Sequence, residues 1–507
     1  MAALSIILAI LKYLLYAVLA LLAVIELNQI RQLYKRYKQG MDVMYFPVIG
    51  FLFYQKCRKK NKDTARWMKE RVSRNDLNGK KATAMNFPLL TKPLVFIQDP
   101  EMISDIFSRE MDICFRKDMN EGVGLFNFGN FYDYSERALV IRGAFTEVFR
   151  TENLDSMVPK IDKAVNELID SLEEEEGNKQ QLDSKGFMDV DLRENISEMF
   201  VRILEKFLFG MGSSTLVEGK PLVNQIVSVF HQIADLMTKP KTYLSLGMNI
   251  VTRLDPQVRE IDRMSELINK KIIELYNEKK DDPNVSQKDF LGGVIHYNRK
   301  HPEEPLTEKE IIGNVMLMVF AAFDPSKYTA GWGMRFLSLS QKDQQILREE
   351  AEKVGTFDGE LTGEKLEAGR ELNAWIKETI RLGTPLPFSD VREFTKNTKV
   401  KGVEFKKGDM ISFSLLWNHF KETDFPDPFE FDRTRHYKAK YHRNNLMPFG
   451  GGKRGCIGMY LAVMIIKIII LNFMRRFSVE NDPSFDSQNW HFPFHTLDKW
   501  LVRLRKL

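Results

Sequence analysis

The hydrophobic pattern of the chain changes sharply near its N-terminus. Residues 1–25 are almost wholly apolar, and Lys12 is their only charged side chain. About 20 such residues suffice to cross the hydrocarbon core of a bilayer as a helix. Four basic side chains follow directly: Arg31, Lys35, Arg36 and Lys38. Because a basic flank stays on the cytoplasmic side of a membrane, the pattern predicts a single-pass anchor over residues 1–27, a basic linker over 28–50 and a cytosolic main domain over 51–507.

Beyond residue 50 the pattern is mainly helical. Apolar positions recur three and four residues apart over long stretches, whereas the alternation typical of strands is confined to short segments around 82–98 and 392–413. One stretch, residues 311–336, is apolar on nearly all sides and must lie in the middle of the fold. Thr307 and Glu310 form a capping box at its start. The other helical stretches span residues 135–149, 154–175, 192–209, 222–237 and 363–382. We therefore expect a mainly α fold with small β-sheets.

Composition narrows the class of protein. The chain has 507 residues, 44% of them hydrophobic, and no linker rich in Pro, Gly or Ser divides it, so one large domain is expected after the N-terminal segment. The net charge of +5 is spread along the chain and gives no reason to expect nucleic-acid binding. The three cysteines, Cys57, Cys114 and Cys456, are too few for a disulfide framework.

A glycine-rich stretch near the C-terminus holds the strongest chemical signal. The glycines from Gly450 to Gly452 lead through Arg454 to Cys456, and a long apolar run over residues 459–473 follows. Glycines allow the backbone to approach a flat or bulky ligand closely. The apolar run is typical of a buried helix, so Cys456 precedes a helix N-terminus, whose partial positive charge favours a thiolate, as does the charge of Arg454. Cys456 is therefore predicted to be a metal ligand or a nucleophile.

Three kinds of site compete for this stretch. Gly450, Gly452 and Gly455 match the dinucleotide fingerprint G-x-G-x-x-G, but no strand pattern precedes them and the region about twenty residues on is basic where an acid is expected. A zinc site needs several clustered ligands, and the chain has no C-x-x-C pair. The third kind of site is haem iron held by one cysteine thiolate.

The stretch resembles the cysteine loop of the cytochrome P-450 family, F-x-x-G-x-R-x-C-x-G. The fixed positions are all present: Phe449, Gly452, Arg454, Cys456 and Gly458. The resemblance implies haem b as the cofactor and Cys456 as the ligand of its iron. It also implies a set of further haem-binding residues: Arg454, Arg392, Phe449, Gly450, Gly458 and Arg137.

Two more segments extend the resemblance. Glu378 and Arg381 match the family's E-x-x-R motif and share one face of a predicted helix. Residues 425–435 resemble its F-P-D-P-x-x-F-x-P-x-R segment, with Arg433 in place of the second Pro. The resemblance implies that Glu378, Arg381 and Arg435 form a buried structural triad beneath the cysteine loop.

The arginines expected to hold the haem propionates match the family less evenly. Arg392 matches its strand arginine. The family also carries W-x-x-x-R on an earlier helix, and here Tyr134 and Ala138 stand at those two positions. Arg137 and Arg142 are the nearby substitutes, and two surface arginines without this role are an equally good interpretation.

The apolar central stretch contains Ala321-Ala322-Phe323-Asp324-Pro325-Ser326. A carboxylate there is costly to bury, which makes Asp324 a candidate for function. Pro325 has no N–H, so it leaves the carbonyl of Ala321 unpaired and is expected to kink the helix. The segment resembles the family's oxygen-binding groove, A-G-x-D-T-T, except that the first Thr is Pro325. The predicted catalytic set is Asp324 as a relay, with Ser326 or a water held by Ala321 in place of the missing hydroxyl.

The resemblance implies a membrane-anchored monooxygenase of the endoplasmic reticulum that oxidises a lipophilic substrate. Electrons would come from a separate NADPH-dependent P-450 reductase or from cytochrome b5, docked near Lys453. Phe320, Phe323 and Phe388 are candidate walls of the substrate pocket. Two alternatives remain. One is a haem-thiolate isomerase or dehydratase acting on hydroperoxides, which Pro325 favours because that chemistry needs no oxygen-activating hydroxyl; the other is a haem-binding protein without enzymatic activity.

Overall fold

The computed structural model describes residues 2–45, 79–86, 92–116, 136–176, 183, 186–210, 215–238, 255–354, 361–438, 441–481, 488–491, 494–497 and 500–507. The chain forms two compact units. The first, the sheet unit, consists of Met1–Lys117, Phe388–Thr423 and His442–Asn445. The second, the helical unit, consists of Asp118–Pro387, Asp424–Tyr441 and Leu446–Leu507.

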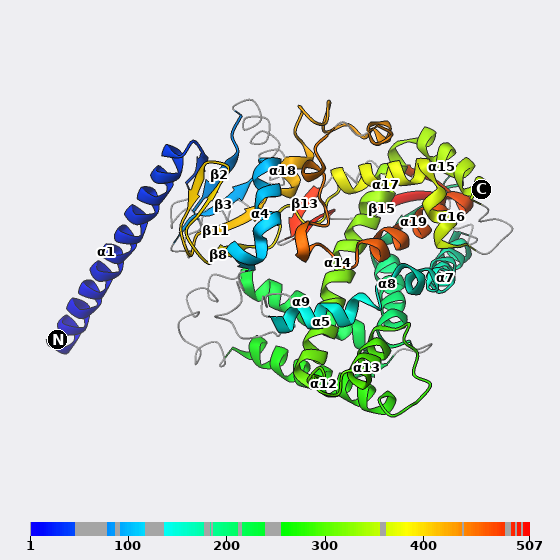
Figure 1. Ribbon diagram of the computed structural model, residues 1–507, viewed down its shortest axis with the longest axis horizontal. Coiled ribbons are helices and arrows are strands. Elements are labelled where there is room, and N and C mark those ends of the chain that lie inside the picture. The colour runs from blue at the N-terminus through cyan, green and yellow to red at the C-terminus, as the bar shows by residue number, and fades with distance from the viewer. Residues whose placement is uncertain are drawn as a thin grey trace. The chain divides into compact units, whose positions relative to one another are not determined.

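The sheet unit is built on a six-stranded sheet with the order β1-β2-β3-β11-β8-β4 (Figure 1). β1 pairs with β2, and β3 with β11, in parallel; the other neighbours are antiparallel. The strands are β1 Asp42–Met44, β2 Ala82–Met85, β3 Leu94–Ile97, β4 Cys114–Arg116, β8 Arg392–Phe394 and β11 Met410–Phe413. β9 (Thr398–Val400) and β10 (Val403–Phe405) form a hairpin, and α4 (Pro100–Ile113), α18 (Leu415–His419) and the short helix η3 (Arg443–Asn445) complete the unit. Asp99 caps α4 by accepting a 2.8 Å hydrogen bond from the Met102 N–H.

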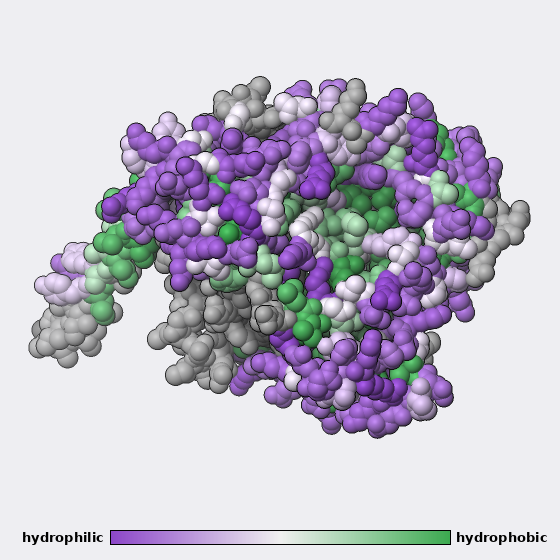
Figure 2. Space-filling view, in the orientation of Figure 1, coloured by the Kyte–Doolittle hydropathy of each residue, from purple (hydrophilic) through white to green (hydrophobic). Residues whose placement is uncertain are grey.

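A long helix, α1 (Ala2–Lys38), projects from the sheet unit. Its segment Lys12–Lys38 is long and apolar enough to cross a membrane, and only 6% of that segment's apolar window is buried. Part of this helix has an apolar surface, which is green in Figure 2. α1 continues to Lys38, so the first part of the predicted linker is helical, whereas residues 46–50 lie outside the described residues.

The last turns of α1 are fixed to the sheet unit. The buried Gln29 accepts a 2.7 Å hydrogen bond from the side chain of Asn86. Arg36 forms an ion pair with Asp409, which is 6% exposed, and donates to the carbonyl of Glu404 at 3.0 Å. These contacts join the helix to the segments around β2 and β10.

The helical unit is mainly α (Figure 1). Its helices are α5 Glu136–Thr146, α6 Thr151–Asp155, α7 Val158–Glu176, α8 Leu192–Phe209, α9 Leu222–Thr238, α12 Pro256–Lys279, α13 Phe290–Lys300, α14 Glu308–Leu339, α15 Gln341–Lys353, α16 Gly363–Ala368, α17 Arg370–Leu382 and α19 Met459–Arg476. The described residues of this unit also form three small sheets. The first consists of β12 (Phe477–Asn481), β15 (Leu501–Lys506) and β5 (Met188–Asp191), the second of β13 (Gln488–His491) and β14 (Phe494–Leu497), and the third of β6 (Leu216–Val217) and β7 (Lys220–Pro221). The predicted mainly α fold with small β-sheets is confirmed.

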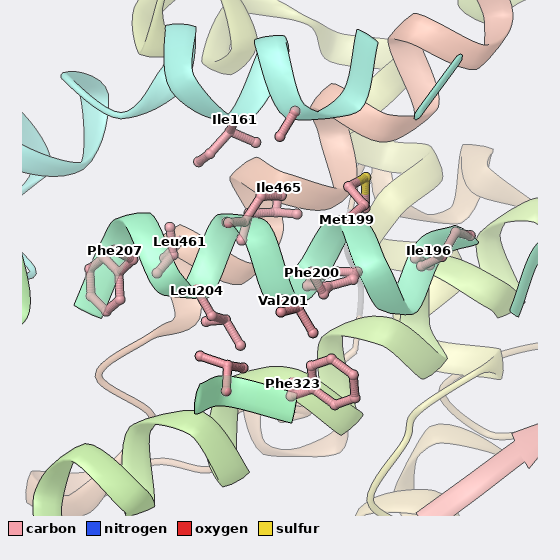
Figure 3. Close-up of a cluster of buried hydrophobic side chains, with 14 of the residues drawn as sticks. Ile161, Ile196, Met199, Phe200, Val201, Leu204, Phe207, Phe323, Leu461 and Ile465 are labelled. Atoms are coloured by element: carbon pink, nitrogen blue, oxygen red, sulfur yellow. The ribbon is translucent and has the colours of Figure 1, made fainter. Parts of the chain in front are cut away.

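α14 is the central helix of this unit. It packs against α8, α9, α17 and α19, and the capping box predicted at its start is present, with Thr307 and Glu310 bonded reciprocally. In Figure 3, α8 lies between α14 and the pair α7 and α19, and its Phe200, Val201 and Leu204 fill the space between them. Because α14 is buried on most sides, a polar or exposed residue on it requires an explanation.

Candidate functional site

The cysteine stretch forms a tight turn ahead of α19. Gly450 and Gly452 both have a φ of 68°, a left-handed conformation that favours glycine. The N–H of Cys456 donates to the carbonyl of Phe449 at 2.9 Å, and the N–H of Gly450 donates to Met447 at 2.9 Å, which closes the turn. The short helix η4 (Gly452–Arg454) lies within the loop that the bond between Cys456 and Phe449 closes. As a result, Cys456 is held two residues before Gly458, the N-cap of α19.

The surroundings of Cys456 fit a large ligand bound through sulfur. Its side chain is exposed, although it stands at the start of a helix whose interior positions are nearly all buried. A Cβ added at Gly458 would lie 4.0 Å from the Cys456 Sγ, so this glycine keeps a side chain away from the thiol. The helix N-terminus favours a thiolate. An exposed cysteine on a glycine turn ahead of a helix is therefore one kind of donor that can hold haem iron.

An arginine from α5 contacts this turn. The Arg142 guanidinium donates a 2.7 Å hydrogen bond to the carbonyl of Gly455, the residue before Cys456. Arg137, one turn earlier on α5, is engaged elsewhere: it binds Glu310 at 2.7 Å and Glu304 at 3.1 Å. The hydrogen bond from Arg137 lowers the pKa of Glu310 to about 2. Of the two arginines considered as substitutes, the structure thus places Arg142 at the cysteine turn.

The middle of α14 carries a buried charge cluster. Asp324 is 4% exposed, and the Nζ of Lys327 lies 3.0 Å from its Oδ1. The Nε2 of His231, on α9, lies 2.8 Å from its Oδ2. Burial raises the pKa of Asp324, but the hydrogen bond from His231 and the charge of Lys327 outweigh it, so the pKa lies below its ordinary value. Asp324 is therefore a carboxylate at neutral pH.

The other predicted residues of α14 differ in exposure. Ala321 is exposed, whereas Ser326 is buried. Helical structure continues through Pro325, whose carbonyl accepts a 2.8 Å hydrogen bond from the Thr329 hydroxyl. Ala321 is therefore one of the few exposed positions on a helix that is otherwise mostly buried.

The predicted pocket phenylalanines point to different neighbours. Phe323 is 4% exposed and points toward Phe200 and Val201 of α8 (Figure 3), so it is part of the core. Phe320 is partly buried, and its ring centroid lies 4.6 Å from that of Phe230 on α9.

A charge network lies around Glu378, which is 0% exposed. Arg381 donates to both carboxylate oxygens at 2.8 Å, and the Nε of Arg435 donates at 3.0 Å. The Nε2 of His436 lies 2.8 Å from Glu378 Oε2. Burial raises the pKa of Glu378, but the hydrogen bonds from Arg381 and His436 outweigh it and lower the pKa to about 2. The structure thus brings together the three residues of the predicted triad and adds His436 to them.

Comparison with known proteins gives this site its context. The family model described as Cytochrome P450 matches residues 62–495, most of the chain. This chain belongs to the cytochrome P450 family. Cytochrome P450 82A1 of Pisum sativum is 27% identical over 316 residues, which cover 60% of this chain and 53% of the pea protein, or about half its length. Tabersonine 16-hydroxylase 1 of Catharanthus roseus is 24% identical over 417 residues, covering 80% and 81%.

A solved structure shows the same fold. The structure described as "Retinoic acid bound cyanobacterial CYP120A1" is similar with a TM-score of 0.69 and 18% sequence identity, covering 86% of this chain and 94% of the other. The predicted P450 fold is therefore confirmed.

Two predicted residues of this P450 belong to the sheet unit. Arg392 is 2% exposed and forms ion pairs with Glu110 at 2.8 Å and Asp390 at 3.3 Å. The ring of Phe388 lies 4.5 Å from that of Phe96. Both residues therefore have well-defined partners within their own unit.

The family's segment after F-P-D-P contains an unusual arginine in this P450, and the structure shows what it contacts. Arg433, on the short helix η2 (Arg433–His436), donates to Glu371 of α17 at 2.9 Å and pairs with Asp343 of α15. Arg433 is only 12% exposed at its side chain. The arginine therefore links η2 to two helices where a proline could make no polar contact.

Arg142 gives a first prediction. Arg142→Ala is expected to loosen the cysteine turn and to increase, several-fold, the fraction of reduced, CO-bound protein that absorbs at about 420 nm instead of about 450 nm. Arg142→Lys retains a cation but not the guanidinium fork, and should fall between the two. The matched control is Arg137→Ala. It removes an arginine of the same helix that pairs with Glu310 and not with the cysteine turn. Equal spectra for Arg142→Ala and the wild type would show that the bond to Gly455 does not hold the turn.

Proposed function

We propose that this P450 is a monooxygenase that inserts one oxygen atom into a lipophilic substrate RH. The balanced reaction is RH + O2 + NADPH + H+ → ROH + H2O + NADP+. The observation that carries the proposal is the exposed Cys456 on its glycine turn at the start of α19. Bound haem b, with Cys456 as its thiolate ligand, would supply the oxygen chemistry. Phe449, Gly450, Arg454 and Gly458 of the same turn, with Arg142, would hold it.

The rest of the chain suggests the kind of substrate and location. α1 would anchor the protein in the membrane of the endoplasmic reticulum, where lipophilic compounds concentrate. The exposed Ala321 and the partly buried Phe320 give the face of α14 an apolar character, and apolar side chains show through the polar surface over α14 and α19 in Figure 2. The Catharanthus relative is named as a hydroxylase, which fits insertion of oxygen.

Electrons would come from a separate reductase that takes them from NADPH, with cytochrome b5 as a second donor. Lys453 is exposed on η4, three residues before Cys456. A cation there would steer an acidic partner toward the side of the turn that holds the cysteine.

Two measurements test the function. The reduced, CO-bound protein should absorb at about 450 nm, as thiolate-ligated haem does. With a P450 reductase and a mixture of fatty acids and sterols, NADPH should be consumed and a product heavier by one oxygen atom should form. A well-folded protein with its band at about 420 nm, or one that oxidises nothing with reductase present, would contradict the proposal.

Pro325 specifically favours one other function, the isomerisation or dehydration of hydroperoxides. These substrates already carry reduced oxygen, so no groove hydroxyl is needed to help protonate O2. The distinguishing result would be reductase-independent conversion of a fatty-acid hydroperoxide together with no NADPH-dependent oxidation.

A pair of variants at Pro325 measures what the missing hydroxyl does. Pro325→Ala and Pro325→Thr both restore a backbone N–H to α14, and each is expected to raise the free energy of unfolding, by up to about 3 kcal/mol. Only Pro325→Thr adds a hydroxyl. For a monooxygenase, it should therefore raise the share of NADPH that ends in product rather than in hydrogen peroxide, at least about twofold relative to Pro325→Ala. Identical coupling in the two variants would show that a hydroxyl at this position is unimportant.

A further inference from the structure

A polar contact joins α9 to the centre of α14. His231 Nε2 lies 2.8 Å from Asp324 Oδ2. One residue earlier, the ring of Phe230 packs on Phe320 of α14 with centroids 4.6 Å apart. The aromatic pair fixes the spacing of the two helices, so the imidazole is held at hydrogen-bond distance from the carboxylate.

Water reaches one end of this contact and not the other. The side chain of His231 is 49% exposed, whereas that of Asp324 is 6% exposed. Asp324 stands three residues after Ala321, so the two positions share a face of α14, and Ala321 is exposed. The pair therefore runs from solvent at His231 to the buried middle of α14, one turn from the exposed Ala321.

The neighbouring charges assign different roles to the members of the cluster. On α14, Lys327 lies 3.0 Å from Asp324 Oδ1, with its ammonium 4.5 Å from the centre of the Phe323 ring. Burial and then the charge of Asp324 raise the pKa of Tyr328, which keeps that hydroxyl protonated. Asp235, one turn beyond His231 on α9, is exposed, and Arg193 of α8 acts electrostatically on Tyr328.

Among the residue types in this cluster, histidine alone carries a donor and an acceptor nitrogen in one ring. The lowered pKa of Asp324 makes a proton on its carboxylate short-lived, so Asp324 is suited to pass a proton on and not to keep it. A histidine can accept a proton at one ring nitrogen and donate one from the other, which is the action of a proton shuttle.

We propose that His231 transfers protons from water to Asp324 during oxygen reduction, and that it thereby replaces a source of protons that Pro325 cannot supply. In this relay, water would protonate Nδ1 as the proton on Nε2 passes to Asp324 Oδ2. Asp324 would then release that proton toward the oxygen being reduced and return to the carboxylate, and exchange with water would restore the starting tautomer of His231. This inference rests on the proposed monooxygenase function, in which O2 must gain protons as well as electrons. His231 reaches the cluster from α9, so the proton source does not depend on the hydroxyl position of α14.

The test uses His231→Gln in the full-length, haem-loaded protein with P450 reductase and NADPH. The glutamine amide can still donate a hydrogen bond to Asp324 but cannot pass a proton on. Oxygen-dependent NADPH consumption is expected to fall about tenfold or more. His296→Gln, on α13, is the matched control and should behave as the wild type.

A reaction driven by hydrogen peroxide distinguishes a loss of proton transfer from damage to the structure. Hydrogen peroxide already contains the two electrons and two protons that O2 must acquire. Peroxide-supported oxidation of guaiacol by His231→Gln should therefore keep the wild-type rate. The inference is overturned if His231→Gln retains the oxygen-dependent rate, or if the peroxide-supported rate falls by the same factor.

A readout without turnover tests the contact itself. In protein labelled with 15N-histidine, the His231 ring signals, assigned by their absence in His231→Gln, should move on Asp324→Asn. Unmoved signals would mean that the two groups are not linked and would overturn the inference. Absence of the band at about 450 nm in the wild type would instead contradict the proposed monooxygenase function. Failure of the inference and failure of the proposed function therefore give different results.

Discussion

Replacing Cys456 with serine is expected to abolish both the absorption band at about 450 nm and NADPH-dependent oxidation, because a serine hydroxyl at this position is not ionised at neutral pH and is a poor ligand for haem iron. Activity should fall to background. The protein itself should remain folded, since the Cys456 side chain is exposed and fills no part of the core. Urea unfolding followed by intrinsic fluorescence checks this, with a midpoint close to that of the wild type in the absence of haem.

Cys114 provides the matched control. It is buried in the sheet unit, and burial raises the pKa of its thiol to about 12, so it is an inert thiol. Cys114→Ala should keep the band at about 450 nm. If Cys456→Ser kept the band or Cys114→Ala lost it, the assignment of the haem ligand to the glycine turn would be wrong.

The second large effect is expected at Glu378. Glu378→Ala leaves Arg381, buried to 0% exposure, without its carboxylate partner, and breaking a buried ion pair in this way costs about 3–5 kcal/mol. We expect the free energy of unfolding, measured by urea titration, to fall by that amount and the yield of folded protein to fall with it. Glu430→Ala is the control, because the side chain of Glu430 is exposed and only its carbonyl accepts from Arg381. A loss as small as that of Glu430→Ala would show that the network contributes little.

The contribution of Glu378 should also depend on pH. Its pKa is about 2 in the folded protein, below the ordinary value of about 4.3 for an unfolded chain. A lowered pKa stabilises the fold above the unfolded value and loses that effect as pH falls through the folded value. The difference in stability between the wild type and Glu378→Gln should therefore be constant above about pH 5 and shrink steadily toward pH 2.

The sequence was most informative where residues close together on one element share a task. Glu378 and Arg381 lie three residues apart on α17, so their contact could be predicted from helix geometry, and the family pattern added Arg435. His436 could not be predicted, because the short helix η2 that turns its ring toward Glu378 has no periodic pattern. Arg433 shows the same limit, since its partners on α15 and α17 are distant in sequence.

Other contacts in the structure could not be predicted because they join helices that are distant in sequence. Arg137 and Arg142 are equivalent by sequence, and only the packing of α5 decides that Arg142 reaches Gly455 while Arg137 reaches Glu310. His231 lies in an ordinary amphipathic helix, and no local signal marks it as a partner of Asp324. Lys327 could have been noticed, because a lysine three residues after a buried aspartate on an apolar helix has a partner within reach.

The attachment of α1 to the sheet unit determines how freely the protein can move on a membrane. Gln29 and Arg36 bond to Asn86, Glu404 and Asp409. The last turns of this helix are therefore part of the folded unit and do not act as a flexible hinge. If α1 spans the bilayer, as proposed, then its tilt is transmitted to the six-stranded sheet. Bilayer thickness, which sets the tilt of a spanning helix, would then also set the angle at which the sheet unit meets the lipid surface.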